Sequence, residues 1–470
     1  MTIIKGGFII NPANGVEGIG DVYINGEIIE SVVLYDSENG LNGSVSDAGL
    51  KDENPDARTN AIISDAVEDP GVGLNVKFSP DELKDKYSDA EVIDAKGLTV
   101  MPGLIDVHSH FRDPGFEYKE DILTGAKAAA AGGYTTVVLM CNTKPTVDNA
   151  DTLDYVLNKG RETGIKVESC GSVTYGLKGE KLTDFDELIK HGAVGFTDDG
   201  IPLMDENILR EAFLKAKGLP ISLHEEDKTL IKNNGINHGK ASEHFGVYGA
   251  PREAEIVLIE RDIKIALETN GVLDVQHISS KEGVELVRKA KNAGGKNIHA
   301  EATPQHFSLT EDALIAKGTL AKLNPPFRTE EDRQAIIEGL RDGTIDIIAT
   351  DHAPHALEEK AKSITEAPSG MIGLETAFAL AVTHLVNESG MSLKDVVSKF
   401  TINPAKLYGF DRGTLTPGKA ADITIADINE KWTVSDSDIQ SKSHNTPFIG
   451  EELTGRIKMT ICDGKIVYGK

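Results

Sequence analysis

A pair of histidines with a cation close behind it is the part of this sequence most suited to chemistry. His108 and His110 end the apolar stretch GLIDVHSH, and Arg112 follows two residues later. Because a β-strand puts residues i and i+2 on one face, all three side chains are expected to point to the same side. Imidazoles on a rigid strand suit a borderline divalent ion, most often Zn2+ in a catalytic site. One such pair is weak evidence by itself.

Further candidate ligands stand at the ends of later apolar runs. In chain order they are Asp198 with Asp199, His224, His277 and Asp351. Glu301 ends another run and is expected to support a metal-bound histidine through a hydrogen bond. Together with the histidine pair, this set predicts a metal site.

The expected ligands exceed the four of one tetrahedral zinc site. In one sensible division, a first ion is held by His108, His110 and Asp351. A second ion is held by His224 and His277, and Asp199 bridges the two. Two ions that share a carboxylate can lower the pKa of bound water and polarise a carbonyl at once.

The elements that must position these residues follow a regular pattern. Between 98 and 405, eight short apolar runs alternate with segments of helical periodicity, many of which end at glycine. Glycine after a helix is the usual C-cap signal. Eight such units predict an α/β fold of the (β/α)8 TIM-barrel type, whose chemistry lies at the C-terminal ends of the strands. The candidate ligands would then meet at one mouth of the barrel.

Both ends of the chain predict a second, smaller domain. Residues 1–97 and 406–470 contain short alternating runs that break at glycine or Asn-Pro, as strands and hairpins do. We expect the two ends to form one small β-sandwich beside the barrel. Segment 34–90 interrupts the first part with 13 acidic against 5 basic residues, which indicates a solvated insertion. A docking or regulatory role is the alternative for this segment.

The composition of the whole chain indicates which kinds of binding partner are excluded. Its 470 residues are 39% hydrophobic and 26% charged, as in ordinary globular proteins. A formal net charge of −26 argues against nucleic acid or an anionic membrane as partner. The N-terminus lacks signal-peptide features, and no apolar run nears the roughly 20 residues that span a bilayer, so a cytoplasmic location is expected. Three scattered cysteines suit neither a disulfide framework nor a thiolate zinc site.

Six motifs at the predicted strand ends and loops carry a resemblance to a known family. They are HSHFRDPG at 108–115, CNTKP at 141–145, GFTDDG at 195–200, LNPPFR at 323–328, ATDHAPH at 349–355 and NTPF at 445–448. With them the chain resembles the bacterial type I dihydroorotases, in the cyclic-amidohydrolase branch of the amidohydrolase superfamily. The resemblance covers nearly the whole chain except 34–90.

The resemblance implies a zinc-dependent reaction, the reversible cyclisation of N-carbamoyl-L-aspartate to (S)-dihydroorotate in pyrimidine (UMP) biosynthesis. Most related hydantoinases and allantoinases bridge their metal ions with a carboxylated lysine at the fourth strand end. In relatives with the FTDDG pattern the second aspartate is similar to that ligand, so the bridge is assigned to Asp199 and not to Asp198. Asp351 is implied as the catalytic residue, which transfers a proton to the ring nitrogen that leaves.

The resemblance also implies the contacts to the substrate. Arg112, Asn142 and His355 would hold its carboxylate, and a planar guanidinium suits that task because it can form two parallel hydrogen bonds. The other implied substrate-binding residues are His110, Asn324 at the pyrimidine ring, and the backbone of Ser369 and Gly370.

Three positions depart from the family pattern, and none of them is a metal ligand or part of the carboxylate clamp. Cys141 stands where proline is usual, Gln305 where histidine is usual, and Ser369 where phenylalanine is usual. Ser369 removes an aromatic ring beside the expected pyrimidine, so substrate affinity is the property expected to differ.

Two other functions stay open at this point. One is an allantoinase- or hydantoinase-like cyclic amidohydrolase built on the same metal frame. The other is a catalytically inactive chain that serves as a structural partner of aspartate transcarbamoylase, although such relatives typically lose metal ligands that this chain retains. An active chain could also associate with that transcarbamoylase or form a homodimer, besides binding its small-molecule substrate.

Overall fold

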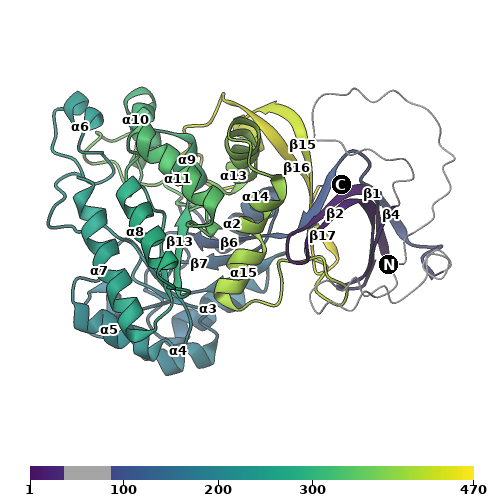
Figure 1. The fold of residues 1–470 in the computed structure, drawn as a ribbon, viewed down its shortest axis with the longest axis horizontal. Coiled ribbons are helices and arrows are strands. Elements are labelled where there is room, and N and C mark those ends of the chain that lie inside the picture. Colours follow the sequence, from purple (N-terminus) through teal and green to yellow (C-terminus); the bar gives the residue numbers. More distant parts are fainter. Residues whose placement is uncertain (36–85, 470) are drawn as a thin grey trace.

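A barrel and a β-sheet built from both ends of the chain lie side by side in this protein (Figure 1). The structure is a computed structural model that describes residues 1–35 and 86–469. The acidic segment expected at 34–90 lies outside the described residues except at its two ends.

The eight apolar runs supply the parallel strands of the barrel. These strands are β6 (Leu104–Ser109), β7 (Tyr134–Leu139), β8 (Lys166–Ser169) with β9 (Gly171–Ser172), β10 (Phe196–Thr197), β11 (Ile221–Leu223), β12 (Leu273–Val275), β13 (Ile298–Ala302) and β14 (Ile347–Ile348). Strands β8 and β9 share one position in the ring, interrupted at Cys170. The last strand meets the first where Ser109 bridges His352 and the His110 N–H donates to the His352 carbonyl at 2.9 Å. The predicted (β/α)8 fold class is confirmed.

Helices follow the strands and cover the outside of the barrel (Figure 1). The α-helices are α2 (Ile122–Ala131), α3 (Ala150–Gly160), α4 (Phe185–His191), α5 (Glu206–Lys215), α6 (Lys240–Phe245), α7 (Glu253–Thr269), α8 (Lys281–Asn292), α9 (Pro304–Ser308), α10 (Glu311–Lys317), α11 (Glu330–Asp342), α12 (Leu357–Lys360), α13 (Leu374–Leu380), α14 (Leu393–Phe400) and α15 (Ile402–Tyr408). The 3-10 turns are η1 (Tyr175–Leu177), η2 (Gly318–Ala321) and η4 (Asp436–Asp438), and η3 (Ala381–Glu388) is a π-helix that continues α13.

Side chains just before the helices fix where these begin. The Asp121 carboxylate accepts a hydrogen bond from the Thr124 N–H at 2.9 Å, and the Ser280 hydroxyl accepts from the Gly283 N–H at 3.2 Å. Each bond satisfies one of the N–H groups that a helix start leaves without a partner, which is worth about 1 kcal/mol.

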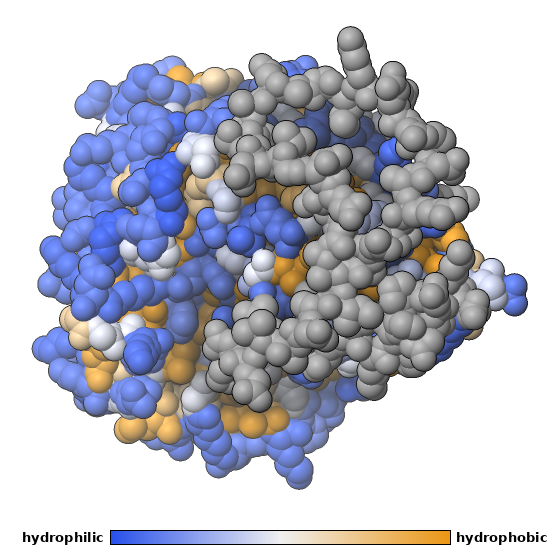
Figure 2. Space-filling view, turned by 45° about the vertical axis from the view of Figure 1, so that its right-hand side comes forward, coloured by the Kyte–Doolittle hydropathy of each residue, from blue (hydrophilic) through white to orange (hydrophobic). Residues whose placement is uncertain are grey.

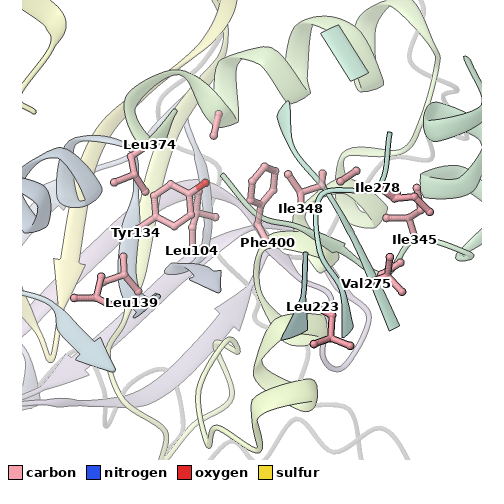
Figure 3. Close-up of a cluster of buried hydrophobic side chains, with 14 of the residues drawn as sticks. Leu104, Tyr134, Leu139, Leu223, Val275, Ile278, Ile345, Ile348, Leu374 and Phe400 are labelled. Carbon is pink, nitrogen blue, oxygen red and sulfur yellow. The ribbon is translucent and has the colours of Figure 1, made fainter. Parts of the chain in front are cut away.

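The barrel core lies between the strands and their helices. Every residue of β7 is buried, as expected for a parallel strand covered on both faces. Figure 3 shows side chains from strands and helices meeting in this core, among them Tyr134 of β7 and Phe400 of α14. Their ring centroids lie 6.4 Å apart in an edge-to-face arrangement, which aromatic pairs favour.

The two chain ends form one domain, as predicted, and its strands form a single hydrogen-bonded sheet rather than two separate ones. The strands are β1 (Thr2–Asn11), β2 (Val16–Asn25), β3 (Ile28–Leu34), β4 (Glu91–Asp94), β5 (Thr99–Pro102), β15 (Ile423–Thr433), β16 (Glu452–Cys462) and β17 (Lys465–Tyr468). Their order is β17-β16-β15-β5-β1-β2-β3, and β4 also pairs with β1. A register shift between Ile4 and Gly7 lets β1 pair with β4 along one half and β5 along the other.

One strand differs from the sequence-based expectation. Residues 99–102 were expected to open the barrel, but they pair as β5 with β1 and β15 of the terminal sheet. The first barrel strand therefore begins at Leu104 rather than at 98. The wider division at 97/98 and 405/406 stays a prediction.

The described surface agrees with the charged composition. The face in Figure 2 is largely hydrophilic over the barrel, with smaller hydrophobic areas between charged side chains. Within residues 1–35 and 86–469, no helix has both the length and the apolar character needed to cross a membrane.

Candidate metal and substrate site

The residues singled out from the sequence meet at one cavity at the C-terminal ends of the barrel strands. The cavity has a volume of about 180 Å3. Its lining residues are His110, Arg112, Asn142, Asp199, Gly200, His224, His277, Asn324, Asp351, Ala353, His355, Ser369 and Gly370. His108, the one remaining expected residue, lies behind this wall and is fully buried (0% exposed).

The group expected to hold the first ion is assembled. The Nε2 atom of His110 lies 3.1 Å from Oδ1 of Asp351, and Nε2 of His108 lies 3.6 Å from the same oxygen. On its other side, the His108 ring contacts Oε2 of Glu301 through Nδ1 at 3.0 Å. Glu301 therefore fixes the ring so that Nε2 faces the cluster, which is the support expected of it.

Asp199 lies at the centre of the cluster. Its Oδ1 is 3.5 Å from Nε2 of His108, 3.9 Å from Nδ1 of His224 and 4.0 Å from Nε2 of His277. Its Oδ2 is 3.4 Å from Nε2 of His110. One carboxylate that faces all four imidazoles has the position a bridging ligand needs.

Asp198, the alternative bridge, points elsewhere. Its Oδ1 accepts a hydrogen bond from the Thr174 N–H at 3.0 Å, and its Oδ2 accepts from the Thr174 hydroxyl. Both aspartates lie beyond the end of β10, and the turn that begins there directs only Asp199 into the cavity.

His224 and His277 face each other, with Nδ1 of His224 at 3.0 Å from Nε2 of His277. The other nitrogen of His224, Nε2, lies 3.0 Å from Oε2 of Glu226. A proton on Nε2 of His224, donated to Glu226, leaves Nδ1 with a lone pair directed at the cluster. Glu226 thus does for His224 what Glu301 does for His108.

These side chains fit a divalent metal ion. Two groups have ligand atoms within 4.8 Å of one another, His108 with His110 and Asp351, and His108 with Asp199 and His277. The first group is the one expected for the first ion, whereas the second contains His108 in place of the expected His224. Nε2 of His108 is buried without a hydrogen-bond partner among the described residues, as a metal-ligand atom would be.

The electrostatics of the cluster also suit a cation. Burial would raise the pKa of Asp199, but the close approach of His108 and the other imidazoles holds this pKa well below its usual range. Burial and the nearby His224 and His108 lower the pKa of His277 well below its usual value. The aspartate is therefore ionised and His277 neutral, as metal binding requires, whereas Glu301 and Asp199 raise the pKa of His108 against the effect of burial, so binding of an ion would release a proton from that ring.

Two residues at the cluster have strained backbones. Asp351 has φ 45° and His277 has φ 35°, values that non-glycine residues rarely adopt. Such strain is tolerated where the surrounding structure fixes the chain, and it gathers at functional sites.

Arg112 reaches the cavity by a different route from the one expected. Strand β6 ends at Ser109, so the alternation of a strand does not extend to Arg112, and that part of the sequence argument is wrong. Instead, Arg112 adopts φ 62°, and its Nε donates to the Pro354 carbonyl at 3.2 Å. The turn directs the guanidinium into the cavity that the metal cluster also faces.

The loop that carries Arg112 packs tightly on the loop that carries Asn142. Gly115 has φ 100°, and a Cβ atom there would lie 2.1 Å from the Lys144 carbonyl oxygen. The Lys144 N–H donates to the Pro114 carbonyl at 2.9 Å. Glycine is therefore required where these two loops meet.

Asn142 connects both sides of the metal cluster. Its Nδ2 donates to Oδ2 of Asp199 at 2.9 Å, and its Oδ1 lies 3.0 Å from Nδ1 of His110. It is thus a supporting partner of two candidate ligands as well as part of the cavity wall.

His355 lines the cavity with both ring nitrogens engaged. Nε2 lies 2.9 Å from the Ser369 carbonyl oxygen, and Nδ1 lies 3.3 Å from Nζ of Lys119. Burial and the positive charges of Arg112 and Lys119 lower the pKa of His355 well below its usual value. The ring is therefore neutral, and its Nε2 proton is donated to the loop at 367–370.

The remaining expected substrate contacts differ in whether their polar atoms already have hydrogen-bond partners within the protein. Oδ1 of Asn324 is buried without a hydrogen-bond partner among the described residues, as expected of an atom that binds a ligand. In contrast, the Gly370 N–H donates to the Lys322 carbonyl at 2.9 Å, and the Gly370 carbonyl accepts from Lys360 at 2.9 Å. Gly370 lines the cavity with its polar backbone atoms already bonded.

The departures at Cys141 and Gln305 are accommodated inside the protein. The Cys141 thiol contacts the Thr197 carbonyl at 2.9 Å, and Nε2 of Gln305 donates to the Thr350 carbonyl at 2.8 Å. The neighbouring His306 donates to the Pro325 carbonyl at 3.0 Å, next to Asn324. It supports that loop and does not line the cavity.

Two supporting residues were missed by sequence reasoning. Glu226 follows His224 by two residues, and the HEE sequence is a local signal that could have revealed it. Asn445 lies almost a hundred residues beyond the last barrel strand, in the NTPF motif, where sequence reasoning gave this residue no role. Its Nδ2 donates to the carbonyls of Ala353 and Gly370, each at 3.1 Å, and its Oδ1 accepts from the His355 N–H at 3.1 Å.

Comparison with known proteins identifies one family for this chain. A model of the amidohydrolase family matches residues 99–467. A dihydroorotase of Clostridium acetobutylicum is 47% identical over 470 residues, which are 100% of this chain and 99% of that protein. A dihydroorotase of Lactococcus lactis subsp. lactis is 53% identical over 399 residues, which are 84% of this chain and 92% of that protein.

Solved structures with the same fold are more distant in sequence. An L-hydantoinase (dihydropyrimidinase) from Arthrobacter aurescens superimposes with a TM-score of 0.80 at 25% identity, covering 100% of this chain and 96% of that one. A dihydropyrimidinase from Brevibacillus agri NCHU1002 gives a TM-score of 0.77 at 21% identity, covering 100% of this chain and 95% of that one, and shows the fold alone.

Proposed function

Because the chain belongs to the amidohydrolase family and its curated relatives are dihydroorotases, we propose that it interconverts N-carbamoyl-L-aspartate and (S)-dihydroorotate in pyrimidine biosynthesis. One observation carries this proposal. The guanidinium of Arg112 faces the same cavity of about 180 Å3 as the histidine and aspartate cluster. A cation beside a metal-binding cluster selects a cyclic amide that carries a carboxylate.

The metal is proposed to be Zn2+, in a pair bridged by Asp199. Imidazole and carboxylate ligands in a buried site suit zinc. His108, His110 and Asp351 would hold one ion, and His224 with His277 the other. When bound, the metal ions supply Lewis-acid chemistry, polarising the ring carbonyl and lowering the pKa of water.

The protein's own residues then move the proton and hold the substrate. In the hydrolytic direction, Asp351 accepts the proton of the attacking water and delivers it to the ring nitrogen as the C–N bond breaks. In the biosynthetic direction the same carboxylate takes the proton from the carbamoyl nitrogen. Arg112, with Asn142 and His355 beside it, fixes the substrate carboxylate so that the reacting carbonyl stays beside Asp351.

The test combines a metal measurement with an assay on the purified chain. We expect about two zinc ions per chain, dihydroorotate hydrolysis that is lost on chelation, and recovery on adding Zn2+. Asp351→Asn should retain metal and lose turnover by several orders of magnitude. A zinc-loaded chain that leaves dihydroorotate unchanged would refute the proposed reaction.

The hydantoinase fold neighbours define the second candidate, a cyclic amidohydrolase acting on hydantoins or allantoin. Arg112 argues against it, because an uncharged ring offers no carboxylate to form the bidentate, charge-assisted pair that a guanidinium favours. Assays with dihydroorotate, allantoin and hydantoin side by side separate the two. An inactive structural partner of aspartate transcarbamoylase is disfavoured by the complete ligand set, and turnover by the isolated chain would exclude it.

Assembly and location are proposed from the family and the composition. Association with aspartate transcarbamoylase or with a second copy of the chain is checked by light scattering of the purified protein with and without that enzyme. A cytoplasmic location is proposed because pyrimidine biosynthesis takes place there, and cell fractionation tests it.

A further inference from the structure

Two buried lysines hold the loop at 367–370, which carries the cavity-lining Ser369 and Gly370. Lys360 is 2% exposed and Lys322 is 1% exposed. Neither forms a salt bridge with any residue in the described part of the chain. A charged side chain is costly to bury, so two such lysines beneath one short loop require an explanation.

Both ammonium groups bind backbone carbonyl oxygens of that loop and its neighbour. Nζ of Lys360 donates to the carbonyls of Gly370 at 2.9 Å, Pro368 at 3.0 Å and Lys322 at 3.2 Å. Nζ of Lys322 donates to the Ala367 carbonyl at 2.7 Å. Burial lowers the pKa of Lys360 to about 7, and the protonated side chain uses all three of its donors in these bonds.

The contacts of Lys360 determine where a backbone donor points. In a trans peptide the N–H points away from the preceding C=O. Because the Pro368 carbonyl points to Lys360, the Ser369 N–H points away from Lys360. The Ser369 carbonyl itself accepts from His355, another residue of the cavity wall. Lys360 and His355 therefore hold successive carbonyls of this loop, whose residues Ser369 and Gly370 line the cavity.

We propose that Lys360 is a positioning residue for substrate binding, which acts by fixing the loop at 367–370, and with it the hydrogen-bond donors of Ser369, at the cavity wall. This inference rests on the proposed function, since the donor is assigned to the same substrate. It also explains how a substrate contact survives at residue 369 without the aromatic side chain usual in the family. The Gly370 N–H is bonded to the Lys322 carbonyl, so the donors that remain at residues 369–370 are the Ser369 N–H and the Ser369 hydroxyl, which is buried without a partner among the described residues.

Kinetics of variants test the proposal on the full-length, zinc-loaded chain with dihydroorotate as substrate. Lys360→Met keeps the length of the side chain and removes all three donors. We expect KM to rise about 10-fold or more while kcat changes less than about threefold, because a contact made equally in ground and transition state is lost. Metal content should stay unchanged.

Lys399→Met is the matched control. Lys399 is also a buried lysine (5% exposed) whose Nζ donates to a backbone carbonyl, that of Ile345 at 3.0 Å, but it does not line the cavity. Its KM should equal that of the parent chain. Equal KM values for Lys360→Met and Lys399→Met would overturn the proposal.

A second pair of variants covers the case in which Lys360→Met does not fold. Lys360→Gln keeps an amide donor on a shorter side chain and is compared with Lys399→Gln, with the same expectation of a selective rise in KM. A selective fall in kcat, or equal KM values in the pair, would overturn the proposal. If the parent chain itself does not hydrolyse dihydroorotate, the proposed function fails, and that outcome is distinct from a failure at Lys360.

Discussion

At the residue scale, the orientation of the two Asp199 carboxylate oxygens decides which side chains this residue contacts. Its two oxygens face four imidazoles, whereas the preceding Asp198 bonds to Thr174. Two adjacent aspartates of the same chemistry therefore have different partners, because the turn that follows β10 directs their carboxylates to different sides.

Asp199→Ala is expected to lower the metal content of the purified chain, because it removes the carboxylate shared by the two proposed ions. Elemental analysis by mass spectrometry measures the metal-to-protein ratio. Asp198→Asn is the matched control and should retain metal. An unchanged ratio in Asp199→Ala would contradict the bridge.

Arg112→Ala is expected to raise KM for dihydroorotate about 10- to 100-fold, since hydrogen bonds to charged groups are worth about 1.5–3 kcal/mol. Metal content should not change, because Arg112 is not a ligand. Steady-state kinetics and metal analysis check both statements. Arg210→Ala, at a surface ion pair with Glu268, serves as the control. Unaltered KM in Arg112→Ala would remove the carboxylate clamp from the mechanism.

At the element scale, the loops after the strands decide the geometry of the site. The 108–115 loop turns at Arg112 through a positive φ, and Gly115 lets it approach the loop that carries Asn142. Both loops contribute to the proposed carboxylate clamp, so their separation should affect substrate binding.

Gly115→Ala is expected to destabilise the protein and raise KM together. A positive φ alone costs a non-glycine residue about 1–2 kcal/mol, and here the new Cβ also meets the Lys144 carbonyl. Gly179→Ala separates the two effects, because Gly179 has φ 67° with nothing within 4 Å of its Cβ position. Thermal unfolding and KM are measured for both. If Gly115→Ala behaves as Gly179→Ala does, the close approach is not important.

The same distinction between strands and loops explains what the sequence could predict. Short buried strands ending in histidine or aspartate are visible as apolar runs, and their shared edge brings the ligands together. Arg112 was expected in the cavity, but its route was not foreseen, because a positive φ outside glycine leaves no periodic signal. Lys360 and Asn445 were missed because each bonds backbone groups of a loop distant in sequence, and such pairings have no spacing rule.

At the scale of the whole molecule, polar contacts attach the terminal sheet to the barrel. Nζ of Lys166, on barrel strand β8, lies 2.6 Å from Oδ1 of Asp422 and 2.7 Å from Oδ1 of Asp463. The Thr424 hydroxyl donates to the Gly133 carbonyl at 2.6 Å. That both chain ends form one domain could be predicted from their alternating runs. That they form one sheet could not, because it depends on the pairing of β5 between β1 and β15.

The buried Lys399 predicts how the stability of the molecule depends on pH. Burial lowers the pKa of Lys399 to about 8, from 10.5. Between these two values the unfolded chain binds a proton that the folded chain does not, so stability rises with pH in this window and is lost as pH falls through about 8. A shift of this size corresponds to up to about 3 kcal/mol.

The measurement compares urea unfolding of the parent chain and Lys399→Met at pH 7.5 and pH 10. We expect the free energy of unfolding of the parent chain to increase relative to that of the variant as the pH rises. The other titrating groups contribute equally to both chains, so the difference reports on Lys399. A difference that stays constant over this range would show that Lys399 keeps an ordinary pKa.

The late position of Asn445 in the sequence determines when the substrate pocket can be completed during synthesis. It follows every barrel strand in the sequence, yet it ties together the loops of Ala353, His355 and Gly370. During synthesis on the ribosome, the barrel strands all emerge before this residue exists. The nascent barrel can close without it, but a fully ordered substrate pocket must wait until the last part of the chain has been made and has docked. Activity is therefore expected to appear only after the C-terminal part of the chain has docked.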